Sequence, residues 1–379
     1  MVKKYFHLLT LIVISIILLN QNNILIDYFL GSLILIELIF LLIFFLKKGE
    51  IYQLKKMIRL KDLFVRSHPY LPFETKPNFL IKNDIHIQDQ KNKKFLTPKY
   101  LKTNSYGYSD GKKGDREPAK SDKIKVCCLG ASTTGNYLFF ENENISYPII
   151  LEQEIKKKLK KKIEVNNFGQ GGYNSQELLI SFLTKIIFTK PDILILYHGH
   201  NDIRSYLANN FKLDYSNSRV NILKNIWKLR ILSYLSFIPL GFVNKIIDKF
   251  SLQNSLLDFI TNNEMNLNNK ANKGLEVYQK NIECIVDICL QRKIKVILST
   301  YCYKKNKSKL SKKIKTIIDK ENKIMKKIAK NKKVFFIDNN KLIKKDDINF
   351  LDSVHFTPEG MKNIARNFMP FVLKCVKEL

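Results

Sequence analysis

A hydroxyl, an imidazole and a carboxylate stand in this sequence at positions that suit attack on an ester carbonyl. Ser132 follows an apolar run, and the small residues Gly130 and Ala131 before it let the backbone turn sharply and leave room beside the hydroxyl. Near the C-terminus, Asp352 lies three residues before His355. Histidine accepts and returns a proton near neutral pH, and a neighbouring carboxylate holds its ring in one tautomer. These residues suit a reaction in which Ser132 attacks, His355 takes its proton and Asp352 supports the imidazole.

Two other stretches offer hydrogen-bond donors to a ligand oxygen. The glycine-rich stretch with Gly169, Gly171 and Gly172 leaves backbone N–H groups open to close approach. Asn201 presents a side-chain amide soon after another apolar run. Each stretch is short, so its meaning depends on a fold that brings the four together.

The apolar runs ahead of these residues are predicted to be strands of one parallel sheet. Runs of apolar and β-branched residues alternate with segments of helical periodicity. This alternation predicts a three-layer α/β sandwich, in which helices cover both faces of a five-stranded parallel, flavodoxin-like sheet. Ligands bind at the carboxyl ends of such strands, where the four stretches would meet. The predicted strands are 124–129, 163–165, 193–196, 294–299 and 334–337.

In this order, the four stretches resemble the motif blocks of the SGNH hydrolases, also called GDSL esterases or lipases. The serine block reads Gly-Ala-Ser here, where the family usually has Gly-Asp-Ser, and the change leaves the nucleophile in place. The likeness covers about Lys123 to the C-terminus. It implies an oxyanion hole made by the backbone N–H groups of Ser132 and Gly172 and by the Asn201 amide. The matching positions are Ser132, Gly172, Gly199, Asn201, Asp202, Asp352 and His355.

The N-terminus carries two apolar stretches, Tyr5 to Leu19 and Ile24 to Leu46. A membrane-spanning helix takes about 20 apolar residues, so the second stretch is long enough and the first is marginal. A cleaved signal peptide is the alternative for the first stretch, but no alanine precedes Ala119 and no small-residue cleavage site is present. We therefore predict a transmembrane hairpin in residues 1–48.

The side of the membrane on which the C-terminal part lies stays open. Lysines flank both outer ends of the predicted hairpin and are absent from its turn at 20–23, so the positive-inside rule favours a cytoplasmic location. The general lysine excess weakens this inference, and many anchored relatives act on glycans outside the cell. Glu37, midway along the second stretch, is predicted to be protonated or paired. It would serve a relay, contact a membrane helix of a partner protein, or bond to Thr10 or Ser15.

Three parts follow from this pattern: the hairpin, a juxtamembrane and lead-in segment at 49–122, and a catalytic domain at 123–379. The lead-in segment is polar and rich in proline, and we expect it to pack on the catalytic domain. The catalytic domain carries an insert at about 203–272, which is uncharged from Ile231 to Val243 and rich in aromatic residues. We consider three interpretations of this insert: a lid over the site, a surface that enters the lipid interface, or a helical subdomain.

Composition argues against a nucleic-acid or metal-binding protein. The net charge of +31 comes almost entirely from lysine, without arginine-rich or aromatic-interleaved patches. The six cysteines show no Cys-x-x-Cys spacing, and His198 and His200 lack a third ligand at a recognisable spacing. We predict neither a metal nor a cofactor.

Three functions fit these observations. The first is a membrane-anchored serine ester hydrolase that removes acyl groups from a carbohydrate or lipid. The second is an O-acyltransferase that modifies cell-envelope glycans with the same residues, because the choice between water and a sugar hydroxyl is a property of the pocket. The third is a non-catalytic membrane scaffold, against which the intact set of Ser132, Asn201, Asp352 and His355 argues.

Overall fold

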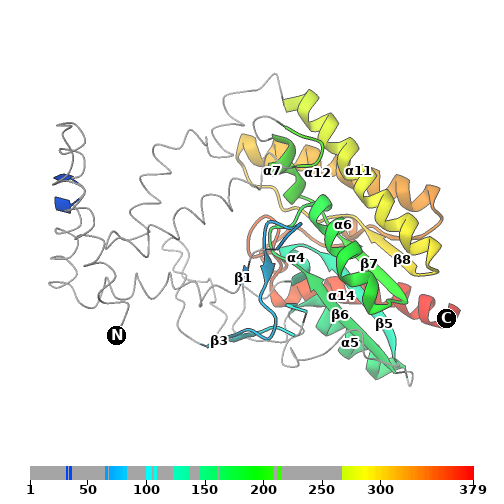
Figure 1. Cartoon of the computed structure of the whole chain (residues 1–379). Coiled ribbons are helices and arrows are strands. Elements are labelled where there is room, and N and C mark those ends of the chain that lie inside the picture. Colours follow the sequence, from blue (N-terminus) through cyan, green and yellow to red (C-terminus); the bar gives the residue numbers. More distant parts are fainter. Residues whose placement is uncertain are drawn as a thin grey trace, which may run out of the picture. The chain divides into compact units, whose positions relative to one another are not determined.

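A computed structural model describes the part of the chain that contains all four motif stretches (Figure 1). Except for residues 31–35, the described residues belong to one compact unit made of 64–219 and 256–379. The described residues are 31–32, 34–35, 65–66, 68–82, 100–104, 106–108, 123–135, 146–159, 162–207, 211–215 and 267–379.

The predicted five-stranded parallel sheet is present. Its strands are β5 (Ile124–Gly130), β6 (Ile163–Gly169), β7 (Ile193–Tyr197), β8 (Lys295–Ser299) and β9 (Phe335–Ile337). They lie in the order β6-β5-β7-β8-β9, and every neighbouring pair is parallel. From β5 the chain adds a strand on one side and then crosses to the other side. The carboxyl end of β5 is therefore the topological switch point, where open α/β sheets bind ligands.

Helices cover both faces of this sheet (Figure 1). One face carries α5 (Tyr147–Lys158) and α14 (Pro358–Glu378), and the other carries α6 (Ser175–Thr184), α11 (Leu267–Gln291) and α12 (Lys309–Asn331). The two cores divide along β5, because successive side chains of a strand point to opposite faces. Val126 and Cys128 pack with α5 and α14, whereas Cys127 and Leu129 pack with the other three helices. The three-layer α/β prediction is confirmed.

The local signals for α6 are also confirmed, apart from its end. Asn174 accepts the backbone N–H of Glu177 at 3.0 Å, and the Glu177 carboxylate accepts the N–H of Asn174 at 2.7 Å, which completes a capping box. The sequence predicts one helix as far as Ile187. The structure instead ends α6 at Thr184 and continues with a 3-10 turn, η2 (Ile186–Thr189).

Four short strands form two small antiparallel pairs in the lead-in segment. β1 (Val65–Arg66) pairs with β2 (Glu74–Thr75), and β3 (Leu80–Lys82) pairs with β4 (Tyr100–Lys102). Buried and partly buried side-chain hydrogen bonds join this segment to α6 and to the glycine-rich stretch. The described residues of the lead-in segment therefore pack on the catalytic domain, as expected from the sequence.

The predicted membrane hairpin lies almost entirely outside the described residues. Of the hairpin at 1–48, the structure describes Gly31, Ser32, Ile34 and Leu35, whereas Glu37 and most of the insert, from 216 to 266, are not described. Within the described ranges, no helix combines the length and the apolar character that crossing a membrane requires. The hairpin stays a prediction.

Candidate active site

Ser132 lies at the carboxyl end of β5, as the first residue of the short helix α4 (Ser132–Gly135). Gly130 permits this arrangement through close packing. A Cβ atom there would lie 2.4 Å from the Tyr197 carbonyl oxygen and 2.2 Å from Oγ1 of Thr134. Its backbone is not left-handed. The sequence predicts a sharp turn at Gly130, whereas the structure requires glycine there because β7 and α4 approach so closely.

The structure brings Ser132, His355 and Asp352 together. Nε2 of His355 lies 3.0 Å from the Ser132 hydroxyl oxygen, and Nδ1 of His355 lies 2.7 Å from Oδ2 of Asp352. The second carboxylate oxygen of Asp352 accepts the backbone N–H groups of Val354 and His355, both at 2.7 Å. This turn just before α14 holds the carboxylate and the imidazole in a fixed mutual orientation.

The hydrogen bonds of Asp352 keep its carboxylate ionised. Burial alone would raise the pKa of Asp352, but the hydrogen bond and charge of His355 and the two backbone N–H groups outweigh it, so the pKa lies below its ordinary value. An ionised Asp352 accepts a hydrogen bond from Nδ1 of His355, which therefore carries the proton. Nε2 is then left to accept a proton from Ser132, which is the arrangement needed for a general base.

The glycine-rich stretch forms a tight turn at 169–173, which we call the glycine loop. The N–H of Gln170 donates to the Gly130 carbonyl at 3.1 Å, and the N–H of Tyr173 donates back to the Gln170 carbonyl at 3.3 Å. Gly172 has a φ of 79°, in the left-handed region that favours glycine. The loop therefore begins against the residue two positions before Ser132.

Asn201 begins α7 (Asn201–Leu207), and its amide donates to the Tyr173 carbonyl at 2.8 Å. An amide nitrogen carries two hydrogens, so this contact leaves a second one to donate to a ligand. The structure thus ties Asn201 to the residue after Gly172. Their joint action as an oxyanion hole with Ser132 stays a prediction.

Asp202, a buried residue of α7, connects this helix to the residues that follow the glycine loop. Its fully buried carboxylate accepts the N–H of Ser175 at 2.9 Å and the Ser175 hydroxyl, and lies 2.6 Å from Nε2 of the equally buried His198. Ser175 is the first residue of α6, directly after Asn174 and the glycine loop. Asp202 therefore joins the start of α6 to α7, and apart from the motif itself no sequence pattern indicates this role.

His200 is a neighbour of the site, and its sequence position suggests no role other than that of a metal ligand. Its φ of 70° is unusual for a residue other than glycine, its N–H donates to the Glu321 carboxylate at 3.2 Å, and its ring stacks on Tyr303. His198 instead bonds to Asp202. In the described part of the chain, no group of three or more His, Cys, Asp or Glu residues is arranged to hold a metal ion.

The surroundings of His200 lower its pKa from the usual 6.5 to about 4. Burial is the main cause, followed by the positive charge of Arg204, and a hydrogen bond with Asn201 partly offsets them. His200 is therefore neutral at physiological pH.

We expect this neutral His200 to make the fold less stable in mild acid. Its pKa is lower in the folded than in the unfolded chain, so the unfolded chain binds the proton first as the pH falls. The stabilisation is complete above pH 6.5 and is lost between pH 6.5 and about 4, by at most about 1.4 kcal/mol per pH unit. Unfolding followed from pH 7.5 to 4.5 should give a smaller pH slope for His200→Asn, which tolerates the left-handed backbone. Equal slopes for the two proteins would contradict this assignment.

The comparisons with known proteins agree with this geometry. The model of the family described as GDSL-like lipase/acylhydrolase matches residues 128–362, a range that includes Ser132, Gly172, Asn201, Asp352 and His355. No curated protein matches this chain.

Several solved structures resemble the fold at low sequence identity. The acetyl xylan esterase AlAXEase is 17% identical with a TM-score of 0.42, and the match covers 66% of this chain and 100% of that one. The lipase/acylhydrolase from Enterococcus faecalis is 15% identical with a TM-score of 0.42, and the match covers 65% of this chain and 94% of that one. A variant of an acetyl xylan esterase from Geobacillus stearothermophilus is 16% identical with a TM-score of 0.41, and the match covers 67% of this chain and 96% of that one. At identities this low, the likeness says nothing about the substrate of this chain.

Proposed function

The chain belongs to the GDSL-like lipase/acylhydrolase family and is an ester-bond hydrolase, and from this premise we propose that it removes acyl groups from a carbohydrate or a lipid at a membrane. The observation that carries the proposal is the hydrogen-bonded series from Ser132 through His355 to Asp352. A serine hydroxyl is a weak nucleophile by itself and requires an adjacent base. This series supplies the base and the group that orients it.

In the first half of the proposed reaction, the Ser132 oxygen bonds to the ester carbonyl carbon while its proton moves to Nε2 of His355. The carbonyl oxygen becomes negative and is stabilised by the N–H groups of Ser132 and Gly172 and by the Asn201 amide. Asp352 stabilises the imidazolium. The bond to the alcohol oxygen then breaks, and His355 returns the proton to the departing alcohol. The products of this half are a free alcohol and an acyl group on Ser132.

In the second half, His355 takes a proton from water, and the oxygen of that water attacks the acyl carbon. The bond to the Ser132 oxygen breaks, the proton returns to this oxygen, and the carboxylic acid leaves. A sugar hydroxyl in the position of the water would transfer the acyl group to a glycan by the same steps. The identity of the acceptor therefore separates a hydrolase from an O-acyltransferase.

We place this reaction at a membrane because of the two apolar stretches at 5–19 and 24–46. Lysines at the outer ends of the proposed hairpin favour a catalytic domain on the cytoplasmic side. A carbohydrate or lipid ester near the membrane surface is then the proposed substrate class.

Product analysis tests the hydrolase assignment. With an acyl-labelled ester as donor, we expect the label to be recovered as free carboxylic acid, both with and without an added glycan acceptor. The Ser132→Ala protein is the control for spontaneous hydrolysis. Recovery of most of the label on the glycan would instead identify an O-acyltransferase. No turnover of any carbohydrate or lipid acyl ester by the intact chain would contradict the proposed substrate class.

A further inference from the structure

We infer that the lead-in segment is a positioning part of the active site, because it holds the glycine loop that presents the oxyanion donors. The described residues of this segment that carry the argument, 68–82, 100–104 and 106–108, lie ahead of the range matched by the family model. The inference rests on the proposed roles of Ser132, Gly172 and Asn201. It assigns positioning roles to the hydroxyl groups of Thr75 and Tyr173.

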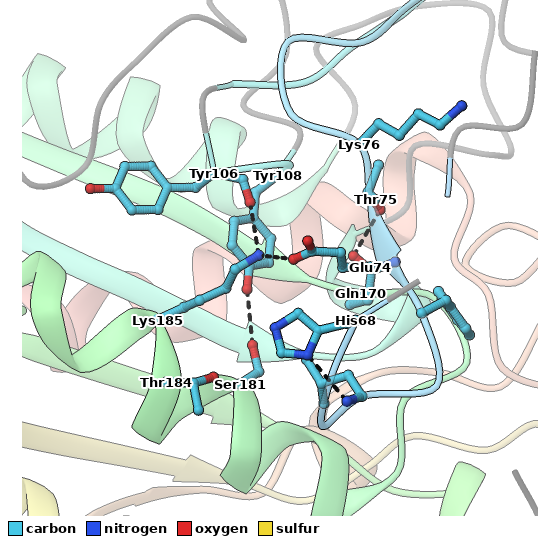
Figure 2. A network of polar contacts seen from close by, with 12 residues as sticks. His68, Glu74, Thr75, Lys76, Tyr106, Tyr108, Gln170, Ser181, Thr184 and Lys185 are labelled. Atoms are coloured by element: carbon cyan, nitrogen blue, oxygen red, sulfur yellow. Dashed lines mark hydrogen bonds and ion pairs between the residues drawn. The ribbon is translucent and has the colours of Figure 1, made fainter. Parts of the chain in front are cut away.

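Two hydrogen bonds join the lead-in segment directly to the glycine loop. The Thr75 hydroxyl donates to the side-chain oxygen of Gln170 at 2.8 Å, and both residues are buried (Figure 2). The Tyr173 hydroxyl donates to the Phe73 carbonyl at 2.5 Å, and the two rings meet edge to face at 5.5 Å. The two ends of the turn, Gln170 and Tyr173, are thus each held by a different residue of the lead-in segment.

Tyr173 passes this constraint on to the proposed oxyanion hole. Its side chain bonds to the lead-in segment, while its carbonyl accepts the Asn201 amide at 2.8 Å. Gly172, the residue before it, carries the proposed backbone donor. A displacement of Tyr173 would therefore move both Gly172 and Asn201. The backbone of Gln170 also bonds the loop to β5, through the Gly130 carbonyl.

The lead-in segment is itself fixed on α6 by separate contacts. The Lys185 ammonium group pairs with Glu74, donates to the Tyr106 carbonyl at 3.3 Å and lies over the Tyr108 ring (Figure 2). The Tyr108 hydroxyl shares a hydrogen bond with the Ser181 hydroxyl at 2.9 Å. These contacts end on the helix and not on the glycine loop. They secure the segment from which Thr75 and Phe73 reach the loop.

This division supplies matched variants for a test on the full chain. The double variant Thr75→Val with Tyr173→Phe removes both hydroxyl hydrogen bonds between the lead-in segment and the glycine loop. Thr75→Ser keeps the hydroxyl that bonds to Gln170. Tyr108→Phe removes one buried hydroxyl from the same segment without touching the loop. The measurements are kcat and KM for a soluble acyl ester, inhibition by a boronic acid that mimics the tetrahedral intermediate, and the thermal unfolding temperature.

We expect the double variant to lower kcat about tenfold and to weaken boronic-acid inhibition by a similar factor, with KM within about twofold of the parent value. Thr75→Ser should restore activity relative to Thr75→Val. Tyr108→Phe should lower the unfolding temperature and leave kcat unchanged. If a contact only stabilised the fold, its loss would lower the unfolding temperature but would not lower kcat at a constant KM.

Parent values of kcat and of boronic-acid inhibition in the double variant would overturn the inference. An equal loss of kcat in Tyr108→Phe would overturn it as well, because the effect would then not be specific to the loop. The proposed function fails by a different result, namely a Ser132→Ala protein that stays active. The two failures are therefore distinguishable in one set of variants.

Discussion

Replacing Ser132 with alanine should lower kcat on an activated ester on the order of a million-fold, with little change in the unfolding temperature. The hydroxyl of Ser132 is the bonded partner of the His355 imidazole at 3.0 Å, and no acyl group can form on alanine. The remaining activity would come from the proposed oxyanion donors, with water as the nucleophile. Steady-state kinetics and covalent labelling by a fluorophosphonate measure the two consequences of the same change.

Ser175 is the serine against which this assignment has to be judged. It too has polar partners, but it is completely buried, and its hydroxyl donates directly to the Asp202 carboxylate. A carboxylate is a weak base for a hydroxyl, whereas Ser132 is partly exposed and faces an imidazole. We expect a fluorophosphonate to label Ser132 and not Ser175. The exposed Ser308 provides a control, since Ser308→Ala should label like the parent chain.

Asn201→Ala should lower kcat about 100- to 1,000-fold, which corresponds to about 2.7 to 4 kcal/mol of transition-state stabilisation. The amide is held at the Tyr173 carbonyl with one hydrogen left to donate, so its loss is felt mainly when the ester oxygen becomes negative. KM should change little, because the ground-state carbonyl carries less charge. Weaker inhibition by a boronic acid would follow from the same cause.

The structure also sets the expected effect of this substitution on stability. Asn201→Ala removes the hydrogen bond to Tyr173, which is worth about 0.5 to 1.5 kcal/mol. A shift of a few degrees in the unfolding temperature is therefore compatible with the assignment. An unchanged kcat would remove Asn201 from the site. A large loss of folded protein would instead make its role structural.

Sequence patterns predicted the sheet because each strand carries its own signal. The runs at β5, β7 and β8 are apolar and β-branched, and burial on both faces of a parallel sheet requires such runs. The Asp352 and His355 pair was also predictable, since the two residues are three positions apart and their bond is local. The meeting of His355 with Ser132 was indicated only by the order of the motif blocks, because Ser132 directly follows β5 whereas His355 lies in the turn before α14, well beyond the end of β9.

Contacts between distant segments left no comparable signal. Thr75 and Gln170 are separated by 95 positions, and neither residue type indicates that they bond. The left-handed backbone of His200 was equally unpredictable, because histidine, unlike glycine, does not indicate a positive φ. Gly130 shows the opposite case, in which the residue was singled out correctly but for a turn and not for its contact with Tyr197.

The hydrogen bond from His355 to Ser132 spans 223 positions and has a consequence for synthesis on the ribosome. A chain emerges from its N-terminus, so the proposed nucleophile and oxyanion donors leave the ribosome well before the proposed base does. His355 is held just ahead of α14, whose Phe368 stacks on Tyr147 of α5. A nascent chain therefore should carry no esterase activity while α14 is still in the exit tunnel. Competence should arrive only after α14 has left the tunnel, when this helix docks and closes the long loop between nucleophile and base.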